Sequence, residues 1–142
     1  MTGTPLTATA GARLPPLPIP VTPSLIVASA IATSDFERVH HDPAWVRSLG
    51  MPDIYMTIHV TNGFVARYVG DWAGPSSRLR AVRLKLGTPA FPGDTLTFTG
   101  EVLRAEDADG ERRLEIDVRG RTGRGEHVGA VVEVCVPLGA QS

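Results

Sequence analysis

Asp35 and His40 stand five residues apart, and their side chains could act together as a general acid and base on a water molecule. On a regular strand the two side chains would point to opposite faces, and on a regular helix they would lie about 140° apart. A bend must therefore bring them together. By itself, this spacing is more typical of a structural loop pair than of a catalytic one.

The segments on either side of the pair could supply such a bend. Residues 25–32 form a short apolar run with β-branched members, which predicts a first strand. Asp42 is a typical helix N-cap, Pro43 suits the first helical position, and Gly50 is a typical stop signal. A short helix over residues 43–49 is the consequence, so the candidate pair is expected in the turn between a strand and a helix.

A longer helix and four more strands are predicted after this turn. About residues 55–68 are apolar around most of the helical circumference, which predicts a buried helix. Four later segments alternate apolar and polar side chains with the period of a half-buried strand, at residues 80–86, 95–102, 113–119 and 128–136. The middle two of these read as a hairpin. The predicted class is α+β, an antiparallel sheet wrapped around one long central helix, which is called a hot-dog fold.

The N-terminal residues 1–23 are rich in Pro, Thr and Ala, and residues 14–20 are biased toward polyproline II geometry. We expect a tail or extended arm here, with the hot-dog domain at residues 24–142. A second possibility is that Leu14, Leu17 and Ile19 pack on a partner or on the domain's own sheet.

The composition argues against several kinds of partner. Fourteen Lys and Arg residues against fifteen Asp and Glu give a formal charge of -1, so nucleic acid and anionic membranes are not expected. No apolar run approaches the ~20 residues that span a bilayer, and the start lacks a signal-peptide pattern. A cytoplasmic protein is predicted. The single cysteine, Cys135, lies in an apolar run and is expected to be a sheet residue.

Several motifs together resemble a known family. They are Asp35-x-x-x-x-His40 with His41-Asp42-Pro43, and the segments at residues 50–54, 62–68, 71–75 and 92–100. Over about residues 24–137 they resemble the MaoC-like (R)-specific enoyl-CoA hydratases, and most of all the small MaoC-like subunit of actinobacterial steroid side-chain enoyl-CoA hydratases. The chain departs from the general pattern at Glu37-Arg38, where many members have Asn-Pro, and at Thr57-Ile58, where they have His-Gly.

The resemblance implies a reaction and a partner. The reaction is syn addition of water to a 2,3-enoyl-CoA thioester, with Asp35 and His40 holding the water. A backbone N–H near Thr57 or Ile58 would stabilise the thioester oxygen at the start of the long helix. The resemblance implies no metal and no cofactor, since CoA is part of the substrate. The expected partner is a second MaoC-like hot-dog subunit in a heteromer, or another copy in a homodimer. The resemblance also implies a bulky acyl group, such as that of a steroid side chain.

Some alternatives remain open at this point. His41 is the rival of His40, although the family spacing selects the first of the two. His59 and His127 are expected to be packing or surface residues. A solvated strand face, rather than a CoA phosphate site, is expected for the basic residues Arg78, Arg80, Arg83 and Lys85.

Two other functions compete with a hydratase. A non-catalytic hot-dog subunit would complete the fold of a hydratase or dehydratase partner. A hot-dog thioesterase is disfavoured by the spacing of Asp35 and His40.

Overall fold

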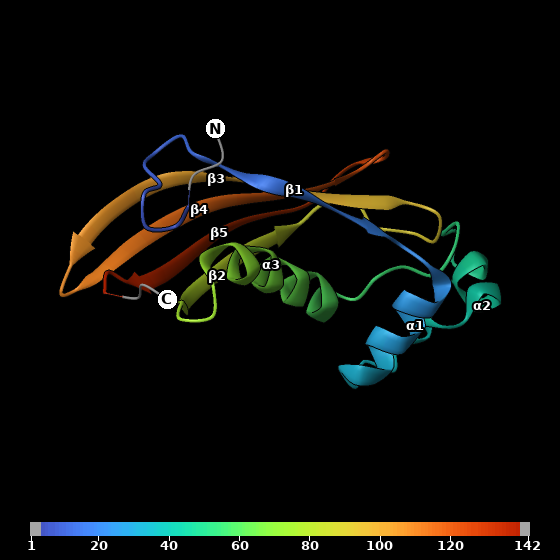
Figure 1. The fold of residues 1–142 in the computed structure, drawn as a ribbon. Coiled ribbons are helices and arrows are strands. Elements are labelled where there is room, and N and C mark those ends of the chain that lie inside the picture. Colours follow the sequence, from blue (N-terminus) through green and yellow to red (C-terminus); the bar gives the residue numbers. More distant parts are fainter. Residues whose placement is uncertain (1–3, 140–142) are drawn as a thin grey trace.

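The structure, a computed structural model, describes residues 4–139 as a curved antiparallel sheet with α3 along its inner face (Figure 1). The strand order is β1-β3-β4-β5-β2. The strands are β1 (Arg13–Pro20), β2 (Arg78–Leu86), β3 (Thr95–Ala108), β4 (Glu111–Thr122) and β5 (Gly125–Pro137). The helices are α1 (Pro23–Ala32), the 3-10 turn η1 (Arg38–His40), α2 (Pro43–Ser48) and α3 (Ile58–Ala73). The predicted hot-dog class is confirmed.

The core lies between the inner face of the sheet and one side of α3. Phe98 and Leu96 of β3 are fully buried, as are Val65 and Val69 of α3. The ring of Tyr68 stacks on Phe98 with centroids 5.9 Å apart. Complete burial of an apolar side chain contributes about 1.5–3 kcal/mol, so these contacts hold α3 against the sheet.

The opposite side of α3 is exposed in the single chain. His59, Asn62 and Arg67 are exposed, and Ile58 is 46% exposed. The helix also starts and ends later than predicted, at Ile58–Ala73 instead of about residues 55–68. The expectation of a helix buried on nearly all sides is therefore wrong for one chain, because the sheet covers α3 on one side.

The predicted strand at residues 25–32 is wrong, since this segment is α1. The Thr22 side chain caps the helix by accepting a hydrogen bond from the Leu25 N–H at 3.0 Å, and Pro23 occupies its first turn. Thr followed by Pro is the same start signal as Asp42-Pro43, which correctly predicted α2. The run also contains Ala28, which favours a helix and outweighs the β-branched residues around it.

The expectation of a free N-terminal tail is also wrong, because residues 13–20 form the edge strand β1. Leu14 pairs with Gly100 and Ile19 pairs with Leu96. The second possibility, packing on the domain's own sheet, is the correct one, since Leu14 and Ile19 are 4% and 8% exposed. Prolines are tolerated here because the outer side of an edge strand makes no ladder hydrogen bonds.

The predicted hairpin is confirmed in β3 and β4, which are longer than expected. Asp109 and Gly110 connect them, both with positive φ, as a two-residue hairpin turn requires.

Cys135 is buried in β5, as expected. Among residues 4–139, none of the helices has both the length and the apolar character that a membrane crossing requires.

Candidate active site

The end of α1 fixes the backbone at Asp35. The Ser34 N–H donates to the Ile31 carbonyl at 3.0 Å, and the Asp35 N–H donates to the Ala30 carbonyl at 2.9 Å. This pair of bonds is a Schellman motif, in which the residue after the helix adopts a left-handed conformation. Ser34 does so with φ 56°, at a position that glycine usually occupies. The chain therefore turns sharply, and the Asp35 carboxylate lies at the start of the following loop.

A backbone carbonyl orients the ring of His40. Nδ1 of His40 is 2.7 Å from the carbonyl oxygen of Tyr55. The two rings also meet edge to face, with centroids 5.4 Å apart, and the Tyr55 ring contacts Phe91 in the same way. His40 is only 6% exposed, so both its position and its orientation are fixed.

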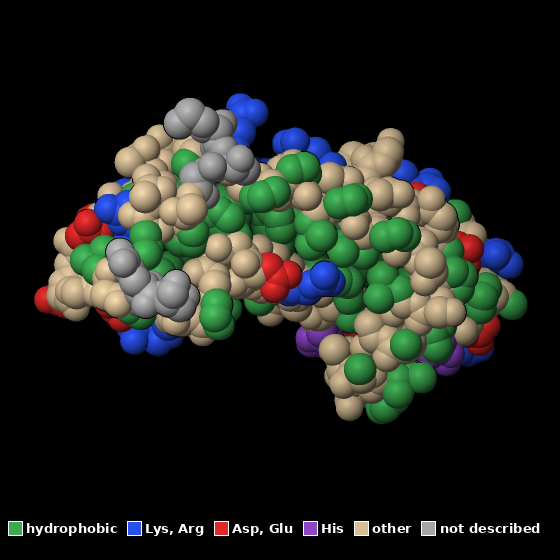
Figure 2. Space-filling view, viewed as in Figure 1, with side chains coloured by type: hydrophobic (Ala, Val, Ile, Leu, Met, Phe, Trp, Pro, Cys, Tyr) green, Lys and Arg blue, Asp and Glu red, His purple; other side chains and the backbone are tan. Residues whose placement is uncertain are grey.

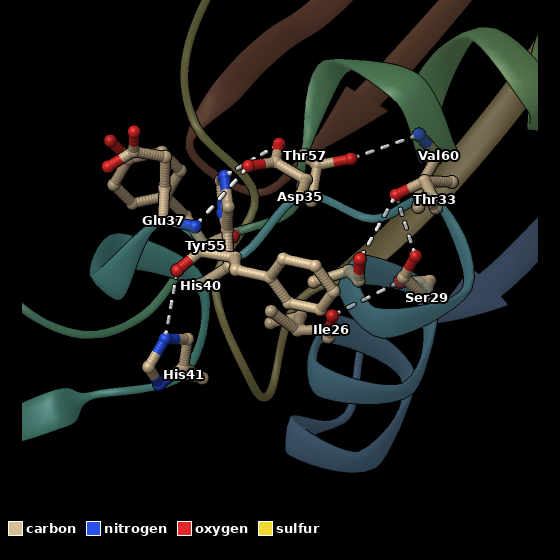
Figure 3. A network of polar contacts seen from close by, with 12 residues as sticks. Ile26, Ser29, Thr33, Asp35, Glu37, His40, His41, Tyr55, Thr57 and Val60 are labelled. Carbon is tan, nitrogen blue, oxygen red and sulfur yellow. Dashed lines mark hydrogen bonds and ion pairs between the residues drawn. The ribbon is translucent and has the colours of Figure 1, made fainter.

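Asp35 and His40 face each other across a short gap (Figure 3). Nε2 of His40 is 3.3 Å from Oδ2 of Asp35. Because a carbonyl oxygen can only accept, Nδ1 of His40 carries a hydrogen and donates it to Tyr55. In the neutral imidazole, Nε2 then presents a lone pair beside the carboxylate. Two neighbouring acceptors can share one donor molecule, and water is the smallest candidate.

His41 does not join this pair. Its Nε2 is 3.2 Å from the Phe36 carbonyl oxygen, and Figure 3 shows the ring pointing away from Asp35. Of the two histidines, the structure places His40 against Asp35. Within residues 4–139, no three His, Cys, Asp or Glu side chains are grouped so that they could hold a metal ion.

The start of α3 provides unpaired backbone donors. The Thr57 side chain caps the helix by accepting from the Val60 N–H at 3.2 Å. Among the described residues, the N–H groups of Thr57, Ile58 and His59 meet no acceptor. Such groups carry the positive end of the helix dipole and can bind a developing negative charge. Tyr55, which holds His40, precedes this turn by two residues.

An open groove of about 430 Å³ adjoins these donors. Ile58, His59 and Asn62 of α3 line one side, and residues 82–84 of β2 line the other. Arg83, at its edge, forms an ion pair with Glu133 at 3.1 Å. Arg78 pairs with Glu111 at 3.2 Å, so these two arginines behave as the solvated strand face that the sequence predicts.

Some contributions to this region were not predicted. The Tyr55 carbonyl and the left-handed Ser34 are backbone features, which residue types do not reveal. His127 is buried and makes two hydrogen bonds, one of them to Thr61 of α3. Its contact crosses 66 positions of the sequence, so only the folded chain brings the two residues together.

The comparisons with known proteins agree with this architecture. No protein-family model matches the chain. A curated relative, the 3-oxo-4,17-pregnadiene-20-carboxyl-CoA hydratase beta subunit of Mycobacterium tuberculosis, is 43% identical over 124 residues, which are 87% of this chain and 93% of the relative. A chain of the ChsH1-ChsH2 complex from Mycobacterium tuberculosis superposes with a TM-score of 0.84 at 42% identity, over 92% of this chain and 99% of that one.

A more distant structure shares the fold. The (R)-hydratase from A. caviae involved in PHA biosynthesis superposes with a TM-score of 0.82 at 20% identity, over 92% of this chain and 98% of that one. The identity to the mycobacterial subunit over most of both chains is high enough to show kinship, and it confirms the resemblance that the sequence motifs carry. The chain belongs to the MaoC-like hydratase family of hot-dog proteins.

Proposed function

We propose that this chain is the catalytic subunit of an enoyl-CoA hydratase. The observation that carries the proposal is the pair formed by Asp35 and His40, with Nε2 3.3 Å from Oδ2. The unpaired N–H groups at the start of α3 support it. A hydratase needs both parts, because water must lose a proton while negative charge develops on the thioester oxygen.

In the proposed reaction, Asp35 and His40 hold one water molecule by its two hydrogens. One of the pair removes a proton as the water oxygen bonds to C3 of the enoyl group. The C2–C3 π electrons move toward the thioester oxygen, where the N–H of Thr57 or Ile58 stabilises the charge. The protonated Asp35–His40 pair then delivers a proton to C2 from the same face, as the electrons return from the thioester oxygen to form the C2–H bond. The product is a 3-hydroxyacyl-CoA formed by syn addition. The overall step is neither an oxidation nor a reduction, so it requires no redox cofactor.

A bulky acyl group is the substrate that we propose. Ile31 and Phe36, which flank Asp35 in the chain, are 60% and 68% exposed. Figure 2 shows hydrophobic side chains on the helical end of the molecule, where α1 and α2 lie. The name of the mycobacterial relative describes a CoA thioester of a pregnadiene carboxylic acid. An apolar surface beside the acid/base pair suits a steroid side-chain acyl group.

A second MaoC-like hot-dog subunit is the partner that we propose. The exposed side of α3 and the groove beside β2 are open in the single chain. The mycobacterial relative is named as a beta subunit, and the related solved structure is a complex of two different chains. A homodimer is the alternative, and the mass of the purified protein with and without its partner distinguishes the two.

The test uses the assembled complex and a panel of 2,3-trans-enoyl-CoA thioesters, from short linear chains to steroid derivatives. We expect Asp35→Asn and His40→Gln each to lower kcat by about 10²–10⁴-fold. His41→Gln is the matched control, because it alters the neighbouring imidazole, which turns away from Asp35. Circular dichroism of each variant checks that the fold is intact.

The possible outcomes separate the competing functions. Unchanged rates in both Asp35→Asn and His40→Gln would support a non-catalytic subunit that completes its partner. Release of free CoA from a saturated acyl-CoA would support a thioesterase. Inactivity of the wild-type complex toward the whole panel would overturn the proposal.

A further inference from the structure

His127 lies at an irregularity in the sheet. Gly120 of β4 pairs with Val128 of β5, and Arg121 pairs with Glu126, so His127 is an extra residue between two paired positions. Such a β-bulge turns a side chain away from its regular direction. Here the imidazole is 3% exposed and contacts α3, although its neighbour Glu126 is exposed.

Both ring nitrogens of His127 have partners. Nδ1 is 2.8 Å from the carbonyl oxygen of Thr88, and Nε2 is 2.8 Å from Oγ1 of Thr61. The carbonyl can only accept, so Nδ1 carries the hydrogen. Burial lowers the pKa of His127, against the opposing effects of the Thr88 hydrogen bond and of Asp94, and this favours the neutral ring. Nε2 is then an acceptor, and the Thr61 hydroxyl donates to it.

Thr61 in turn lies against the first turn of α3. Its N–H donates to the Thr57 carbonyl oxygen at 3.2 Å. Its Oγ1 lies 3.3 Å from the same oxygen, but the one hydroxyl hydrogen is donated to His127, so the N–H alone holds this carbonyl. The Thr57 carbonyl and the Ile58 N–H belong to one planar peptide unit and point in opposite directions. Whatever fixes the carbonyl end therefore fixes the direction of the Ile58 N–H, which is one of the unpaired donors of the candidate site.

We infer that His127, by anchoring the Thr61 side chain and with it the first turn of α3, is a positioning residue that aims the Ile58 N–H at the thioester oxygen of the substrate. The inference rests on the proposed hydratase function. Loss of an oxyanion donor typically costs about 10²–10³-fold in kcat. A donor that is present but poorly aimed loses part of its stabilisation of the transition state. We therefore expect kcat to decrease by about 10–100-fold when the contact between His127 and Thr61 is removed.

Two pairs of variants isolate this contact in the assembled complex. Thr61→Val removes the hydroxyl and keeps the shape, whereas Thr61→Ser keeps the hydroxyl. The amide nitrogen of Asn can replace Nδ1 but cannot reach Thr61, so His127→Asn keeps only the bond to Thr88. The amide oxygen of Gln can replace Nε2, so His127→Gln keeps the contact with Thr61.

The expected result is a difference in kcat within each pair. Thr61→Val and His127→Asn should lower kcat by about 10–100-fold with little change in KM, because the Ile58 N–H stabilises the transition state more than the bound substrate. Thr61→Ser and His127→Gln should recover most of the loss. Thermal unfolding midpoints are measured for all four, and kinetics are recorded well below the lowest midpoint.

Two results would overturn the inference. The first is wild-type kcat in both Thr61→Val and His127→Asn. The second is an equal loss within each pair that follows the unfolding midpoints, which would indicate a purely structural role. Failure of the proposed function gives a different pattern, namely wild-type kcat in Asp35→Asn or an inactive wild-type complex, and the inference falls with it.

Discussion

Ser34 adopts a left-handed backbone conformation directly before Asp35, with φ 56° and with both N–H groups bonded back to α1. The proposed catalytic carboxylate is thus attached to a strained turn. A non-glycine residue in this conformation costs roughly 1–2 kcal/mol. The two hydrogen bonds to the end of α1 hold Ser34 in this conformation despite that cost.

Replacing Ser34 tests how far this turn controls Asp35. Ser34→Gly should raise the free energy of unfolding by up to about 1 kcal/mol and keep kcat, because glycine accepts this φ without strain. Ser34→Val should lower the free energy of unfolding by about 1–2 kcal/mol and also lower kcat, because a β-branched residue resists the turn. Urea titration and kinetics measure both. Equal changes of the free energy of unfolding and of kcat in the two variants would show that the turn is not strained.

The burial of Leu14 leads to a prediction about β1. Leu14→Ala should lower the free energy of unfolding by about 2–5 kcal/mol, because Leu14 is 4% exposed and packs in the core. Leu103→Ala is the control in the neighbouring strand, since Leu103 is 44% exposed and should change stability by no more than about 0.5 kcal/mol. Chemical denaturation measures both. A small effect of Leu14→Ala would restore the idea of a dispensable arm.

Tyr68 ties α3 to β1 through one hydrogen bond. Its hydroxyl donates to the Pro15 carbonyl at 2.8 Å. Tyr68→Phe keeps the stacking on Phe98 and leaves that carbonyl without its donor, so the free energy of unfolding should fall by about 1 kcal/mol.

The same tyrosine should make stability sensitive to alkaline pH. Burial raises the pKa of Tyr68 from 10.0 to about 12, so the folded state holds the phenolic proton more tightly than the unfolded chain does. This stabilisation is complete below pH 10 and is lost as the pH rises from 10 to about 12. Tyr68→Phe should lack that component of the loss. Denaturation curves of both proteins are recorded from pH 9 to pH 12 to check this prediction. The same change in the free energy of unfolding with pH in both proteins would refute it.

His127 should make stability sensitive to acid. Burial lowers its pKa below 6.5, so the unfolded chain takes up a proton at a higher pH than the folded chain does. The contribution is therefore complete above pH 6.5 and is lost as the pH falls from 6.5 through the lower pKa of the folded state. His127→Gln does not titrate and should show a weaker decline in the free energy of unfolding between pH 7.5 and pH 5. The same decline in both proteins would assign the acid sensitivity to other groups.

Periodicity predicted the parts of this fold that depend on local pattern. Alternation along residues 95–102 and 113–119 predicted the β3–β4 hairpin, and Asp42-Pro43 predicted α2. The strand predicted at residues 25–32 was wrong because a short apolar run fits either a strand or a helix, and the Thr22 cap was the deciding signal. The tail predicted at residues 13–20 was wrong because prolines exclude a central strand but not an edge strand.

The candidate site was predicted only in part. The pairing of Asp35 with His40 needed a bend, and the bend exists, but it follows a helix and not a strand. The bond from His40 to the Tyr55 carbonyl has no signature in residue types. The contact of His127 with Thr61 depends on a one-residue bulge between β4 and β5, which the alternation of side chains does not reveal.

The prolines of β1 give the two edges of the described sheet different capacities for growth. Positions 15, 16, 18 and 20 have no N–H to offer an incoming strand, whereas β2, at the other edge, contains no proline. The edge at β1 is therefore a poor template for a further strand, whereas the edge at β2 can accept one. Two chains that paired through β2 would leave only their β1 edges exposed, so we expect strand addition to stop at a dimer and not to continue into a filament.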